Sequence, residues 1–184
     1  MQWRDSKDRF GAVSIGLHWL NALVVVALLI LGFIAWPLPR GAERSGLLHW
    51  HMSLALLLLP FAIARVVWRI RHGKPATEQR NTLLKTVADI VWKVMLTAIV
   101  LQMLTGSVLV WMHDRPLEIF GLLTIPSPLP PVGEPQAALV QQVHLVSALV
   151  LATAIVVHIL GALKHLLIDR DGVTQRMLRF QRKP

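Results

Sequence analysis

The stretch Leu139–Ile168 reads LVQQVHLVSALVLATAIVVHILGALKHLLI and has, besides His165 near its end, two widely spaced histidines, His144 and His158. They lie fourteen residues apart. At about 100° per residue this spacing brings both to nearly the same helical face, and at about 1.5 Å per residue it separates them by roughly 21 Å. The stretch is long enough to cross a bilayer, where an ionisable side chain is costly and marks a functional candidate. We therefore expect two stacked sites on one membrane helix.

The composition extends this membrane assignment to the whole chain. Of its 184 residues, 54% are hydrophobic, and the mean hydropathy is +0.56. We expect an all-α membrane protein: one domain over residues 1–184, forming a four-helix transmembrane bundle with spans at about 13–36, 47–68, 87–112 and 139–168. The chain has no cysteine, which excludes disulfides, thiolate-bound iron–sulfur clusters and the C-x-x-C-H haem attachment.

The basic residues predict how the bundle is oriented. Fourteen of them fall on one side of the expected spans, and only Arg40, Arg44 and Arg115 fall on the other. By the positive-inside rule both termini are cytoplasmic, as in a multi-pass protein of an inner (cytoplasmic) membrane. The net charge of +9 then reflects topology and attraction to anionic lipid, and we expect no nucleic-acid partner. The fourteen are Arg4, Lys7, Arg9, Arg69, Arg71, Lys74, Arg80, Lys85, Lys164, Arg170, Arg176, Arg179, Arg182 and Lys183.

With this topology, four histidines fall at two depths. His18 lies near the cytoplasmic start of the first span, and His51 lies near the outer start of the second. The fourth span runs inward, so that His144 is outer and His158 is inner. Each level then has one histidine from the fourth span and one from another helix. The sequence therefore predicts an inner pair, His18 with His158, and an outer pair, His51 with His144.

Paired histidines at two levels favour haem over other metals. A lone membrane histidine is usually an interhelical hydrogen-bonder. Zinc usually needs three or four protein ligands, whereas haem iron needs two axial ligands, and imidazole serves as one. Two b-type haems held by histidine pairs fit best. Because bis-imidazole ligation leaves no open iron position, this arrangement indicates electron transfer rather than oxygen activation.

Two further residues are candidates for the inner level. Arg65 follows His51 by fourteen residues, and an arginine at that depth needs an anion such as a haem propionate. Snorkelling to the interface is an equal alternative for Arg65. His165 follows His158 by seven residues and could meet propionates or a quinone headgroup. A solvated helix end is the alternative for His165.

At these residues the chain resembles the bacterial cytochrome b561 family, which is related to the cytochrome b subunits of nickel–iron hydrogenases. The matching pieces are RFGAVSIGLHWL from Arg9, HMSLALLLLPFAIARVVWR from His51, and the paired histidines closing with ALKHLLIDRDG. The resemblance implies a four-helix dihaem protein that exchanges electrons with ubiquinone. It implies ligands at the same four histidines and favours His51 over His49. One type of member oxidises superoxide at the outer face.

Three functions follow as hypotheses. The first is an oxidoreductase or carrier between an outer donor, with superoxide as one candidate, and ubiquinone. The second is a haem-containing membrane anchor for a partner dehydrogenase or hydrogenase. The third is a haem-free transporter or structural bundle whose histidines hydrogen-bond between helices. The sequence names no catalytic residue and no oligomeric state.

Overall fold

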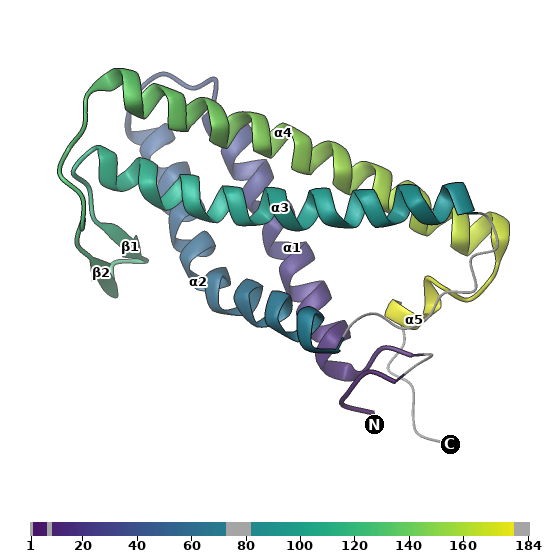
Figure 1. The fold of residues 1–184 in the computed structure, drawn as a ribbon. Helices are drawn as coiled ribbons and strands as arrows, with labels where there is room; N and C mark the ends of the chain where they lie inside the picture. The colour runs from purple at the N-terminus through teal and green to yellow at the C-terminus, as the bar shows by residue number, and fades with distance from the viewer. Residues whose placement is uncertain (1, 7–8, 73–81, 179–184) are drawn as a thin grey trace.

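Four long helices dominate the computed structural model, which describes residues 2–6, 9–72 and 82–178 (Figure 1). Each of the four is long and apolar enough to span a membrane, which confirms the expected four-helix membrane fold. They extend a few residues beyond most of the expected limits of the apolar runs, because polar residues at the ends continue the helices into the interface. The helices are α1 (Ala12–Ala35), α2 (Ala42–His72), α3 (Thr82–Met112) and α4 (Glu134–Lys164).

The helices associate as two units. α1 packs on α2, and α3 packs along α4, whereas α2 touches α3 only lightly. Figure 1 shows α3 and α4 side by side, with α1 and α2 crossing behind them. All four helices meet in one apolar cluster about midway along their length, built from Val25, Leu58, Ala62, Ala98 and Leu151. Elsewhere along the described residues, the backbone of α4 makes few close approaches to α1 and α2, so the seam between the two units is sparsely packed.

The first and last described residues lie at the same end of the bundle, which we call the terminal end (Figure 1). There the Trp68 indole N–H donates to Ser14 Oγ (2.9 Å), and Ser14 Oγ donates to the Asp5 carboxylate (2.7 Å). The same carboxylate accepts the Gly11 N–H, just before α1 begins. Gly11 is required here, because a Cβ would lie 2.5 Å from the backbone of Arg4. This chain of bonds ties α1 to α2.

A small β-hairpin lies at the opposite end, which we call the hairpin end. Strands β1 (Leu117–Ile119) and β2 (Leu123–Ile125) pair antiparallel, with Leu117 opposite Ile125. Phe120 and Gly121 both have positive φ, and the Leu122 N–H donates to the Ile119 carbonyl, which closes a tight turn. From sequence this stretch is apolar enough to lie in the interface; the structure adds that it is a two-stranded sheet.

Ser53 joins the β-hairpin to α2 by hydrogen bonds. Ser53 is fully buried, accepts a hydrogen bond from the Phe120 N–H at 3.0 Å and donates one to the Glu118 carbonyl at 3.2 Å. Two backbone groups of the turn region therefore depend on one hydroxyl. Without it they would be buried and unsatisfied, at a cost of about 1–3 kcal/mol each.

We expect Ser53→Ala to release the β-hairpin without unfolding the helices. The test is limited chymotrypsin cleavage after Phe120, which should become at least several-fold faster in detergent-purified protein. Ser107→Ala is the matched control, because among the described residues the Ser107 hydroxyl bonds only the Met103 carbonyl of its own helix. Equal cleavage rates in the two variants would contradict this role for Ser53.

Candidate functional site

The four predicted histidines lie as two facing pairs, each across the seam between the helix units. His18 on α1 faces His158 on α4, with ring centroids 6.2 Å apart and ring planes at 71°. His51 on α2 faces His144 on α4, at 6.4 Å and 70°. We call these the terminal-end pair and the hairpin-end pair. The near-identical geometry at both levels indicates one kind of site built twice.

The hairpin-end pair is held closely by α1 and α3. Gly32 on α1 lies against the His51 ring, and Gly106 on α3 lies against the His144 ring; added Cβ atoms would approach the rings to 3.4 and 3.2 Å. Both glycines therefore make room for an imidazole. The Nδ1 atom of His51 is buried beside the backbone of Leu28 without a well-formed hydrogen bond.

Polar side chains of α3 support His144 from behind. Thr105 Oγ1 lies 2.8 Å from His144 Nδ1. Gln102 Nε2 donates to the His144 carbonyl and to Ser147 Oγ, each at 2.6 Å. Neither Thr105 nor Gln102 was identified from the sequence, because polar residues within an apolar helix give no indication of which neighbour they face.

The terminal-end pair has a cationic neighbour. Arg65 Nη2 lies 3.0 Å from Nδ1 of His18, so the structure places Arg65 at the depth expected from sequence and in contact with a histidine. The Trp19 ring lies edge-on to the His18 ring at 5.3 Å, and its indole N–H donates to the Met177 carbonyl. The segment that contains α5 (Gln175–Leu178) thus reaches back to α1 beside this pair.

His165 faces an acidic turn at the end of α4. It begins a π-helical turn, η1 (His165–Asp169), and its Nδ1 lies 2.7 Å from Asp171 Oδ2. Partial burial raises the pKa of the Asp171 carboxyl, but hydrogen bonds from the Val173 N–H and the His165 ring outweigh it and hold that pKa below its usual value. Lys164 Nζ donates to Asp169 Oδ1 at 2.7 Å. The structure thus places His165 at a partly exposed helix end beside two aspartates, and a contact with a propionate or a quinone headgroup stays a prediction.

His49 differs in placement from His51. Its ring packs against Phe120 of the β-hairpin, with centroids 6.4 Å apart. His51 is the one of the two that faces α4.

A comparison with protein families decides which family this is. The model described as prokaryotic cytochrome b561 matches residues 9–180, which include all four helices and all four paired histidines. The chain belongs to the prokaryotic cytochrome b561 family. It is 26% identical to cytochrome b561 homolog 2 of Escherichia coli strain K12 over 183 residues, covering 97% of this chain and 95% of that protein. It is therefore a bacterial membrane cytochrome of the haem b type that transfers electrons.

The residues of this cytochrome b561 fit haem b. Two metal–imidazole bonds of about 2 Å, together with the extent of two imidazole rings, place ring centroids roughly 6 Å apart, which agrees with both pairs. The buried Nδ1 of His51 has no well-formed hydrogen bond that would hold the ring in another orientation. The sparse backbone contact between the two helix units is what a flat cofactor between them requires. Arg65 offers a guanidinium to a propionate at the terminal end.

Proposed function

We propose that this cytochrome b561 holds two b haems, one at each histidine pair, and passes electrons between a donor at the hairpin end and ubiquinone. His18 and His158 are the ligands at the terminal end, and His51 and His144 are those at the hairpin end. The observation that carries the proposal is the repeated facing geometry of the two pairs. Haem iron supplies the one-electron chemistry by alternating between the ferric and ferrous states.

Buried apolar residues lie between the two histidine pairs, where an electron would pass from one haem to the other. Leu151 lies midway between His144 and His158 along α4 and is almost fully buried, as are Leu58 and Ala62 opposite it. This apolar cluster excludes water between the two levels and keeps the local dielectric low. Each histidine pair would supply two imidazole ligands to one haem iron, so the cytochrome would move electrons without binding oxygen at iron.

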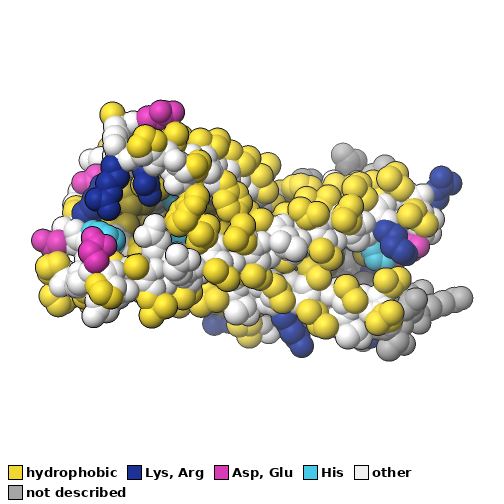
Figure 2. Space-filling model, turned by 90° about the horizontal axis from the view of Figure 1, so that it is seen from above, with side chains coloured by type: hydrophobic (Ala, Val, Ile, Leu, Met, Phe, Trp, Pro, Cys, Tyr) yellow, Lys and Arg dark blue, Asp and Glu magenta, His cyan; other side chains and the backbone are white. Residues whose placement is uncertain are grey.

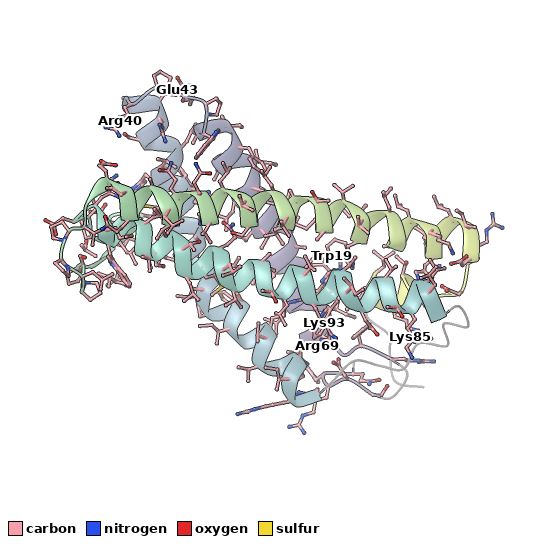
Figure 3. The ribbon with its side chains drawn as sticks, turned by 45° about the horizontal axis from the view of Figure 1, so that its top comes forward. Trp19, Arg40, Glu43, Arg69, Lys85 and Lys93 are labelled. Atoms are coloured by element: carbon pink, nitrogen blue, oxygen red, sulfur yellow. The ribbon has the colours of Figure 1, made fainter. Side chains whose placement is uncertain are left out.

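The distribution of charged residues supports an orientation in which the hairpin end lies on the outer side of the membrane. Figure 3 shows Arg40 and Glu43 at that end, with Arg69, Lys85 and Lys93 toward the other; Arg69 and Lys85 are among the residues that predict the cytoplasmic side. Figure 2 shows a hollow at the hairpin end, with basic, acidic and histidine side chains around it. Arg44 is half-buried and donates to the Leu38 carbonyl at 3.3 Å. Cations beside a hollow attract a small anion.

Superoxide is the donor that this electrostatic feature supports. Each superoxide gives up one electron and leaves as O₂; two such electrons and two protons convert ubiquinone to ubiquinol. We propose that ubiquinone reacts near the terminal end, where Arg65 and Trp19 surround His18. His165, bonded to Asp171 nearby, is the candidate there for a proton-bearing neighbour of the headgroup.

The first test is a reduced-minus-oxidised visible spectrum of the detergent-purified protein, with a haem count by pyridine haemochrome. Two b haems per chain with low-spin bands are expected. One haem or none would overturn the dihaem proposal. Ubiquinol formation in proteoliposomes supplied with superoxide then tests donor and acceptor. Reduction only in the presence of a co-purifying dehydrogenase would instead support the anchor-subunit hypothesis.

A further inference from the structure

The hydroxyl of Thr105 determines which nitrogen of His144 carries the proton. It lies 2.6 Å from the Leu101 carbonyl and 2.8 Å from His144 Nδ1. A carbonyl oxygen only accepts, so at 2.6 Å the single hydroxyl hydrogen must point to Leu101; otherwise two lone pairs would face each other. The contact with His144 is then a bond donated by its Nδ1–H. The lone pair of the His144 ring is consequently on Nε2, the free nitrogen.

Further contacts hold the backbone and the ring edge of His144. Gln102 on α3 bonds the carbonyl of His144, and Ser147 on α4, which is buried, donates to the same carbonyl at 3.1 Å. Gly106 on α3 lies against the ring edge, where a Cβ would approach Cε1 to 3.2 Å. These contacts keep the ring beside Thr105, whose hydroxyl bonds its Nδ1.

We infer that Thr105 is a positioning residue that makes His144 a stronger electron donor to the hairpin-end haem and lowers the reduction potential of that haem. This inference rests on the proposed function, because it assigns a role to a ligand of that site. A hydrogen bond from the far nitrogen of a ligating imidazole increases the basicity of the ring and favours ferric iron. At the other level, the His18 Nδ1 faces the guanidinium of Arg65, which can only donate. The two levels therefore differ in this respect.

The test is a spectroelectrochemical titration of the dihaem protein carrying Thr105→Val, which keeps the side-chain shape and removes the acceptor. We expect one of the two potentials to rise by the equivalent of about a tenfold change in ferric-to-ferrous preference, or about 59 mV. The potential that rises should be the one that is absent from the titration of His144→Ala. Thr105→Ser should restore the wild-type value, and Thr105→Cys, a weak acceptor, should give an intermediate one.

Thr153→Val is the matched control, because Thr153 makes the same bond to the carbonyl four residues earlier, Leu149, and hydrogen-bonds no histidine among the described residues. If the wild-type protein shows two potentials and neither changes in Thr105→Val, the inference is overturned and the proposed function stays intact. A wild-type protein without two potentials would overturn the proposed function and this inference together. An equal shift in Thr153→Val would overturn the inference alone, since the cause would then be general loosening of the helices.

Discussion

His144→Ala is expected to remove one b haem and leave the other. His144 and His51 face each other at the hairpin end, whereas His18 and His158 face each other toward the terminal end. His158 follows His144 by fourteen residues on α4. Removing one axial ligand leaves a vacancy that the described residues around the pair do not fill. The haem count should therefore fall by half, and the lost spectral component should be the same in His51→Ala. His18→Ala and His158→Ala should remove the complementary component.

Haem counts, visible spectra and circular dichroism of the four variants check this result. His113→Ala is the matched control at the hairpin end, because that exposed ring bonds only the Leu109 carbonyl of its own helix within the described part of the chain. Loss of both haems in every variant, with the helical content intact, would show that the histidines do not act as two separate pairs.

Arg65→Leu is expected to lower the potential of the terminal-end haem. A buried cation disfavours the ferric state of nearby iron. At a separation of roughly 8 Å and an effective dielectric of about 20, a unit charge contributes about 2 kcal/mol. This is equivalent to roughly 90 mV for a one-electron couple. Together with Thr105, Arg65 would make the hairpin-end haem the stronger reductant, which favours transfer toward the terminal end.

The measurement is a redox titration of Arg65→Leu beside Arg65→Lys, which keeps the charge. Only the potential missing from His18→Ala should move, and the lysine variant should stay close to wild type. As the structure stands, Arg65 donates to Nδ1 of His18, so the proton of that ring is on Nε2. Iron at Nε2 requires Arg65 to turn away or the proton to leave. A potential that does not respond to Arg65→Leu would show that the charge is neutralised by a neighbour.

The sequence predicted the four-helix fold because apolar runs of membrane length leave few alternatives. The depth of a residue on a spanning helix follows from its position in the run, and for this reason His18, His51, His144 and His158 could be assigned to levels. Their role as ligands stays a prediction. The same reasoning placed Arg65 at the correct level, but the sequence did not indicate that its partner would be a histidine nitrogen.

The residues around the histidines could not be predicted from this pattern. Thr105 and Gln102 contact His144 only because α3 and α4 pack in one particular register, which the sequence periodicity does not specify. The β-hairpin was missed for a different reason: its strands are three residues long, too short for an alternating pattern. The sequence signal available was Gly121, where the backbone adopts positive φ between two short apolar runs.

The sparse contact between the α1–α2 and α3–α4 units has a consequence for biogenesis. Each unit is a self-contained pair that can enter the bilayer during synthesis, the first before the second has left the ribosome. Among the described residues they are joined by one apolar cluster, the facing histidines, the β-hairpin on α2 and the bond from Trp19 to Met177. A cofactor that binds only the joined form stabilises it by mass action. Maturation would therefore be governed by haem supply, and chains made in haem-starved cells would persist as two inserted halves, open to degradation by membrane proteases.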